Sequence, residues 1–226
     1  MKKFYHIPHS SNYIPQEYLS EYCISKENLD KFSRILCDHR TDEMIDKNDE
    51  YLIFPYSRLF CDVERFDSDL EVMNKIGMGI LYNVNHNLDI IREYPSNEIL
   101  KYYYEHHKKL NDLVGNILNE HNEILFIDLH SYAKDPLPYE LNKNSKRPQI
   151  CIGVNDIFDN SILSRVEFLL NKFEFEYHIN EPFSGCLLPS NYIDDDRVKG
   201  IMIEIRKDVY ETKEGFSRIK NFLKEI

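Results

Sequence analysis

The chain has 226 residues, of which 39 are Asp or Glu and 28 are Lys or Arg, so its formal net charge is −11. Hydrophobic residues make up 42% and aromatic residues 13%, which is enough apolar side chain to bury a core and excludes global disorder. The acidic excess argues against nucleic acid and anionic membranes as partners, because both are bound by clustered cationic charge.

The cysteines and the N-terminus narrow the class of protein further. The five cysteines are odd in number, widely spaced and never in a C-x-x-C pair, which favours a reduced, cytoplasmic protein over a disulfide scaffold or zinc ribbon. Polar residues follow MKKF where a signal peptide needs an apolar stretch, and no window approaches the roughly 20 apolar residues of a membrane-spanning helix. We therefore expect one cytoplasmic domain over residues 1–226.

Short apolar runs alternate with helical patterns along the chain. In chain order, the pattern predicts a strand at 3–8, a helix at 28–47, strands at 51–54, 59–63 and 79–84, a helix at 97–119, strands at 123–130 and 150–154, a helix at 161–173, a strand at 200–205 and a helix at 215–226. Ser96 is the expected N-cap of the long helix. This alternation predicts an α/β fold with a mixed, mostly parallel sheet and helices on both faces.

Polar residues stand where three of the predicted strands end. His9 follows the first strand, His130 ends the apolar run at 123–130, and Glu204 lies near the end of the last strand. In α/β sheets ligands gather beyond the carboxyl ends of strands. Two imidazoles and a nearby carboxylate are what a catalytic zinc requires, with Asp128 available behind a ligand to orient it.

Each of these residues also has a structural interpretation. A histidine at a strand end can simply be hydrogen-bonded to the fold. A carboxylate in an apolar strand must be paired or functional, and Arg206, two residues after Glu204 on the same face, is the alternative partner.

Two further polar segments carry candidate residues. Arg58, Asp62, Glu64 and Arg65 alternate with apolar residues in 57–66, and this segment is either an arginine clamp for a carboxylate substrate or an edge strand with an internal ion pair. In the predicted helix at 28–47, Asp42 and Asp46 lie one turn apart on one face. This face is either exposed to solvent or the source of an oxygen ligand for a metal.

Motifs along almost the whole chain resemble those of the N-formylglutamate amidohydrolase (N-formylglutamate deformylase) family. The similar stretches are IPHSSNYIP at 7–15, TDEMID at 41–46, SRLFCDVERF at 57–66, GMGILY at 77–82, YYYEHHKKL at 102–110, DLHSYAKDPLPYE at 128–140, RPQICIGVNDIF at 147–158, NEPFSGCLLPSNY at 180–192 and IMIEIRKDVY at 201–210. The resemblance implies a hydrolase fold related to the zinc carboxypeptidases and aspartoacylase.

In those relatives a metal-binding histidine follows an early strand, and an Asp-x-Asn-Arg segment, a D-x-H segment and a late glutamate base come after it. His9, the segment 62–65, the segment 128–130 and Glu204 occupy these places in the same order. Two positions depart from the pattern. Asn12 stands where a glutamate ligand is expected, so we expect Asp42, or else Asp46, as the acidic ligand. Glu64 stands in place of the asparagine, which puts the exact substrate in question more than the reaction class.

The resemblance implies hydrolysis of an N-acyl bond with one zinc ion held by His9, His130 and an acidic residue, for which we expect Asp42. Glu204 is then the general base and acid, and Arg65 stabilises the oxyanion. Arg58, Arg206 and Ser131, with Arg147 in addition, are the candidates for binding the substrate.

The expected substrate is a small anion, N-formyl-L-glutamate, cleaved to formate and glutamate. The alternatives are another N-acyl amino acid or peptide-like amide, or a non-catalytic relative that binds a metal or an anion.

Overall fold

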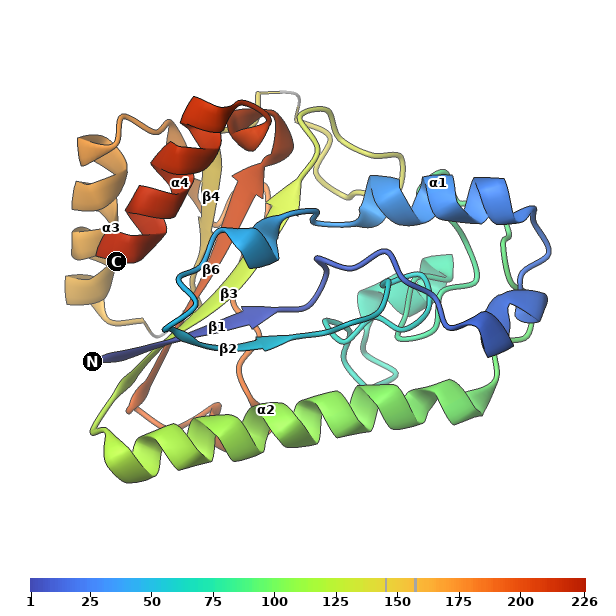
Figure 1. Cartoon of the computed structure of the whole chain (residues 1–226), viewed down its shortest axis with the longest axis horizontal. Coiled ribbons are helices and arrows are strands. Elements are labelled where there is room, and N and C mark those ends of the chain that lie inside the picture. The colour runs from blue at the N-terminus through green and yellow to red at the C-terminus, as the bar shows by residue number, and fades with distance from the viewer. Residues whose placement is uncertain (145, 157) are drawn as a thin grey trace.

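Six strands form one mixed sheet in the order β2-β1-β3-β6-β4-β5 (Figure 1). They are β1 (Lys2–Ile7), β2 (Glu50–Ile53), β3 (Ile124–Tyr132), β4 (Ile150–Gly153), β5 (Tyr177–Ile179) and β6 (Val198–Arg206). Strands β1, β2, β3 and β6 are parallel, whereas β4 is antiparallel to β6 and parallel to β5. The expected mixed, mostly parallel sheet is confirmed.

The computed structural model describes residues 1–144, 146–156 and 158–226. Ser145 and Ile157, the latter inside the motif at 147–158, lie outside the described residues. No helix among the described residues is long and apolar enough to cross a membrane.

Helices cover both faces of the sheet (Figure 1). The four α-helices are α1 (Lys26–Leu36), α2 (Leu100–Glu120), α3 (Asn160–Lys172) and α4 (Lys213–Glu225). Alternate residues of a strand point to opposite faces, so Phe4 and Phe126 are buried with α2, whereas Tyr5 and Ile127 are buried with α3 and α4. The prediction of helices on both faces is confirmed. Short 3-10 helices complete the fold, at Gln16–Glu21, Thr41–Glu43, Val72–Ile76, Asn97–Ile99, Ser190–Tyr192 and Lys207–Tyr210.

The predicted strands at 59–63 and 79–84 are wrong. Ser57 O accepts the backbone N–H groups of Phe60 and Cys61 at 2.9 and 3.2 Å, so the first segment is a turn. The second segment makes only isolated bridges, Met78 with Tyr82 and Val84 with Ile90. Both segments lie in a separate core cluster beneath the loops that follow β2. Their side chains are buried although the segments are loops. A buried loop and a buried strand have similar apolar composition, so composition alone does not distinguish them.

The predicted helix at 28–47 is also too long, because α1 ends at Leu36. Cys37 is extended, with ψ at 137°, and Arg40 has φ at 67°, in the left-handed region. The helix is therefore broken before Thr41–Glu43, and the side chains of 38 and 42 do not share a helix face. The short strand β5 was not predicted. The helix expected at 97–119 is confirmed, and Ser96 accepts the N–H of Glu98 at its start.

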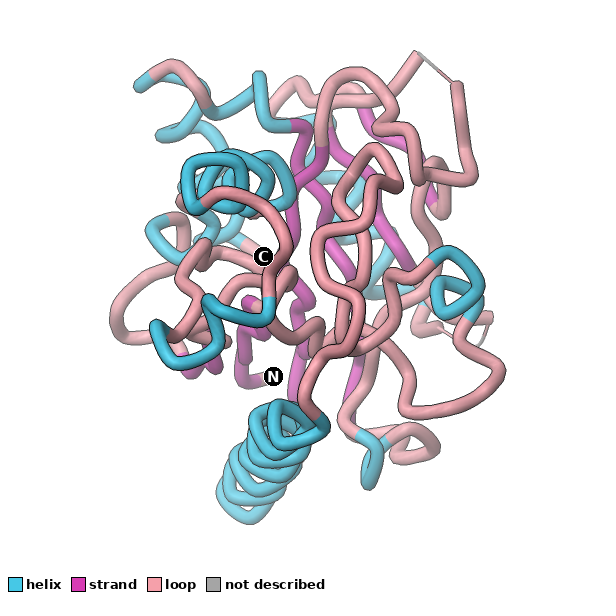
Figure 2. The backbone as a smooth tube through the Cα atoms, turned by 90° about the vertical axis from the view of Figure 1, so that its right-hand side faces the viewer, coloured by secondary structure: helices cyan, strands magenta, loops and turns pink. Residues whose placement is uncertain are grey.

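The carboxyl ends of β1, β3 and β6 meet at one edge of the sheet. Figure 2, turned toward this side of the molecule, shows loops gathered over the strands there, while both termini lie at the opposite end in Figure 1. This edge carries the polar residues that the sequence singled out.

Candidate active site

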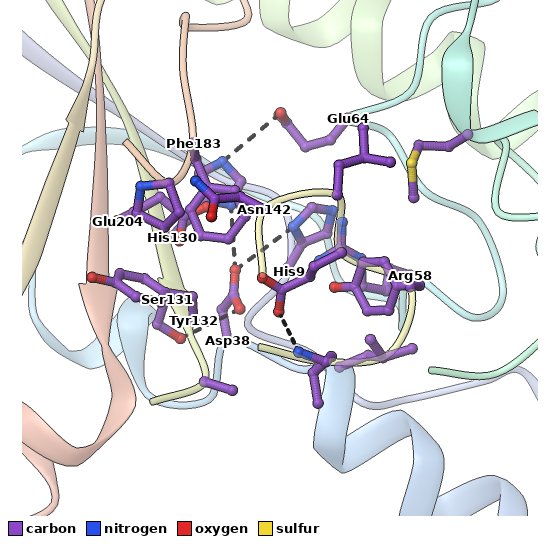
Figure 3. Close-up of a pocket in the computed structure, with 18 of the residues that line it drawn as sticks. His9, Asp38, Arg58, Glu64, His130, Ser131, Tyr132, Asn142, Phe183 and Glu204 are labelled. Atoms are coloured by element: carbon purple, nitrogen blue, oxygen red, sulfur yellow. Dashed lines mark hydrogen bonds and ion pairs between the residues drawn. The ribbon is translucent and has the colours of Figure 1, made fainter. Parts of the chain in front are cut away.

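The sheet register brings the strand-end residues together. His130 in β3 is directly opposite Glu204 in β6. His9 follows β1, which is the other neighbour of β3. The rings of His9 and His130 lie 5.2 Å apart between centroids. All three residues line one pocket, with a volume of about 430 Å³ (Figure 3).

Asp38 is the acidic residue that faces both histidines. Its N–H donates to His9 O at 2.8 Å, which anchors the loop after α1 to the chain after β1. Its Oδ2 lies 3.3 Å from His130 Nδ1 and 3.7 Å from His9 Nδ1 (Figure 3). All three residues are buried, and their ligand-type atoms lie within 4.8 Å of one another. They are the atom types of a catalytic zinc site.

Separate carboxylates orient the two imidazoles. Asp62 Oδ1 lies 2.8 Å from His9 Nε2, and Asp128 Oδ1 lies 3.2 Å from His130 Nε2. A carboxylate only accepts, so we assign the proton of His9 to Nε2, and the lone pair of its Nδ1 then points toward Asp38. His130 hydrogen-bonds the same carboxylate through Nδ1, whereas its Nε2 has no hydrogen-bond partner among the described residues. Since His9 Nδ1 is also buried without such a partner, a cation between the three residues would satisfy it.

Asp62 is the centre of an ion-pair network beside His9. Its Oδ2 accepts from Arg58 Nη2 at 3.0 Å and from Tyr82 OH at 2.6 Å, and it lies 3.4 Å from Arg65 Nε. Burial alone would raise the pKa of Asp62, but Arg58 and Arg65 hold it well below its ordinary value. Asp62 is therefore a permanent anion that accepts the Nε2 proton of His9.

The two arginines keep one nitrogen each for a ligand. Arg58 donates to Asp62 through Nε and Nη2, and Arg65 donates through Nε to Met78 O and through Nη2 to Tyr82 OH. Neither Nη1 makes a hydrogen bond within the described part of the chain, and both residues line the pocket. The pocket thus presents two positively charged donors that are already fixed in position.

Glu204 faces the pocket and is not paired with Arg206, the partner that its structural interpretation requires. Arg206 instead donates to Asp208 Oδ1 at 2.7 Å and to the carbonyl of Arg147. Glu204 Oε2 is buried and has no hydrogen-bond partner among the described residues, and burial raises the pKa of this carboxyl to about 8. Such a carboxyl is suited to exchanging a proton near neutral pH.

Several predicted residues lie away from the site. Asp42 is exposed in the 3-10 helix Thr41–Glu43 and lines a different surface hollow together with Asp46. The left-handed turn at Arg40 separates both aspartates from the histidines, so the structure places Asp38 where we expected Asp42. Asn12 is likewise exposed and outside the cluster.

Of the remaining candidates for substrate binding, Ser131 alone reaches the pocket. Its Oγ donates to Asp38 Oδ1 at 3.3 Å and accepts from Tyr210 OH at 3.0 Å, so it holds the carboxylate in place. Arg206 lines a separate hollow, and Arg147 pairs with the buried Glu140 and donates to Ala133 O. The structure does not bring these two arginines into the pocket.

Asp38 and Tyr82 are the site residues that sequence reasoning missed. Asp38 directly follows the apolar end of α1, Leu36 and Cys37, so the change from apolar to polar residues that identified His9 and His130 also applies here. Tyr82 carried no such signal, because it lies inside a run that reads as a strand.

The comparisons with known proteins identify the family of the chain. Residues 3–211 match the family described as N-formylglutamate amidohydrolase. The chain belongs to the N-formylglutamate amidohydrolase family. No curated protein matches the chain in sequence. Family membership indicates an amidohydrolase that acts on a small molecule.

Two solved structures share the fold. The crystal structure of N-formylglutamate amidohydrolase from Ralstonia eutropha JMP134 is 20% identical, with a TM-score of 0.79, over 98% of this chain and 89% of the other. The gene product Atu2144 from Agrobacterium tumefaciens is 16% identical, with a TM-score of 0.70, over 99% of this chain and 88% of the other. The expected fold is confirmed over essentially the whole chain.

Proposed function

We propose that this protein is a zinc-dependent amidohydrolase that cleaves the N-acyl bond of an acyl amino acid, with N-formyl-L-glutamate as the first substrate to test. One observation carries the proposal: two buried imidazoles turn their Nδ1 atoms toward a shared carboxylate, in the same pocket as a glutamate whose Oε2 has no partner among the described residues. The family membership of the chain supports the same reaction class.

The donor set fits one zinc ion. His9 and His130 supply neutral nitrogen, and Asp38 supplies oxygen, which is the ligand number of a catalytic site with an open position. Bound there, zinc would act as a Lewis acid toward the amide carbonyl and the attacking water. Ser131 and the two orienting carboxylates hold these ligands in place before any ion binds.

Glu204 is the residue placed to move protons. It would accept a proton from the attacking water and deliver it to the leaving nitrogen, as general base and then general acid. Its position opposite His130 in the register of β3 and β6 keeps it beside the ligands. No described residue competes for Oε2, so this atom is free to make that contact.

The arginines would bind the charged parts of the substrate. Arg65 and Arg58 line the pocket, each with an Nη1 that makes no hydrogen bond to a described residue, and Asp62 fixes both guanidinium groups. Arg65 would stabilise the oxyanion of the tetrahedral intermediate, and Arg58 would hold a carboxylate. Fixed positive charge at such positions is commonly worth a few kcal/mol.

The decisive assay is formate release from N-formyl-L-glutamate by protein that has been chelated and then supplied with zinc. We expect release only after zinc is added, and a loss of about 10²–10⁴-fold in kcat for Glu204→Gln with zinc binding retained. A Glu204→Gln variant that turns over normally removes Glu204 as the base. Zinc binding without hydrolysis of any tested amide would instead support a non-catalytic metal-binding relative.

A second candidate substrate class follows from the pocket wall. Phe66, Val72, Leu141 and Phe183 line the pocket, together with the carboxylates of Glu71 and Glu140. With Arg206 and Arg147 outside, this wall favours an N-acyl amino acid with one carboxylate and an apolar side chain. A panel of N-formyl and N-acetyl derivatives of glutamate, leucine and phenylalanine separates the two classes by kcat/KM.

A further inference from the structure

A second group of metal-binding side chains lies on the other side of the His130 ring. His6 Nδ1 is 2.9 Å from Asp128 Oδ1 and 3.3 Å from Glu64 Oε1, and the three ligand-type atoms lie within 4.8 Å of one another. His6 and Asp128 are fully buried, and the side chain of Glu64 is 12% exposed. This group shares no residue with the His9, Asp38 and His130 cluster.

Several buried atoms around this group have no partner. Asp128 Oδ2 and Glu64 Oε1 make no hydrogen bond to any described residue. His130 Nε2 approaches from the first cluster, 3.8 Å from Glu64 Oε2 (Figure 3). Two carboxylates this close in a buried place repel each other unless a cation lies between them or one of them keeps its proton.

We propose that His6, Glu64 and Asp128 form a second binding site for a divalent cation of the zinc class. One imidazole nitrogen and two carboxylates are a donor set that zinc and cobalt(II) accept. His6 Nε2 lies 2.8 Å from His106 Nε2, and with His6 donating to His106 its Nδ1 offers a lone pair to the cation, in place of its present hydrogen bond with Asp128 Oδ1 at 2.9 Å. The site does not depend on the amide substrate, so it stands or falls separately from the hydrolysis.

Counting bound metal tests the proposal without turnover. Metal-free full-length protein is dialysed against buffered zinc, and bound zinc per chain is measured by mass spectrometry. We expect two ions for the natural sequence, one for Glu64→Gln, one for Asp38→Asn and none for the double variant. Glu71→Gln is the matched control, because Glu71 also lines the pocket but accepts only backbone N–H groups, so it should keep two ions.

A natural protein that binds one ion, or a Glu64→Gln variant that still binds two, overturns the second site. Circular dichroism confirms that each variant is folded. If Glu64→Gln does not fold, His6→Asn removes the imidazole ligand from the same site and is expected to bind one ion. Two ions in folded His6→Asn would overturn the proposal equally.

Discussion

The strongest test of the site concerns Asp62, which touches no substrate in our proposal. Asp62→Asn keeps the shape of the side chain but removes the anion that accepts the proton of His9 Nε2 at 2.8 Å. Loss of an orienting carboxylate typically weakens metal binding by about 10–100-fold. We expect that loss in zinc affinity, measured by competition with a fluorescent chelator.

The same substitution should lower stability. Arg58 and Arg65 lose their shared counter-charge, and breaking a buried ion pair typically costs about 3–5 kcal/mol. Their side chains keep 14% and 16% exposure, so we expect a decrease of about 2–4 kcal/mol in the free energy of unfolding by urea. Asp67→Asn, whose carboxylate only accepts from Tyr104 OH at the surface, should change neither quantity. Unchanged zinc affinity in folded Asp62→Asn would refute the assignment of the Nε2 proton and of His9 Nδ1 as a ligand.

Three further predictions follow from the placement of individual side chains. Asp38→Asn should weaken zinc binding at the first cluster by at least about 100-fold, whereas Asp42→Asn should bind zinc normally in the same competition assay. Arg58→Gln should raise KM for an acyl amino acid by about tenfold, and Arg206→Gln should leave steady-state kinetics unchanged, because Arg206 lies outside the pocket. Burial lowers the pKa of His107 from 6.5 to about 4, so the unfolded state takes up the proton first and stability present above pH 6.5 is lost as the pH falls toward 4. The free energy of unfolding by urea should therefore fall by about 1–3 kcal/mol less for His107→Gln than for the natural protein over that range.

The sequence was most informative where hydrophobic pattern and position coincide. The four parallel strands of the sheet are short apolar runs between helices, and their order along the chain predicted the α/β class. His9, His130 and Glu204 could be singled out because each stands where an apolar run ends. The structure brings these three into one pocket, since parallel strands place their carboxyl ends at the same edge.

The acidic residue could not be chosen from spacing alone. Asp38 and Asp42 differ by four positions, so a continuous helix would have placed both on one face. Because Arg40 adopts the left-handed conformation, Asp38 and Asp42 do not lie on one helix face. The sequence DHRTD at 38–42 contains no signal that predicts this conformation for an arginine. Likewise, the arginines of the chain look alike in sequence, but the carbonyl of Arg147 and the carboxylate of Asp208 hold Arg206 away from the pocket.

The net charge of −11 is compatible with an anionic substrate, because the overall charge of the protein and the local charge of the pocket arginines act over different distances. Surface charges are screened beyond about 8 Å at physiological salt, whereas the Nη1 atoms of Arg58 and Arg65 would contact the ligand directly. Those two nitrogens suit one carboxylate and one oxyanion. A second carboxylate, as in N-formyl-L-glutamate, needs a further donor, and Lys207 is the other cationic side chain that lines the described part of the pocket. Its Nζ already donates to Ile35 O at 3.0 Å. Lys207→Met should therefore reduce kcat/KM for formylglutamate and spare formyl-leucine if the dianion is the true substrate; an equal effect on both would favour the apolar class.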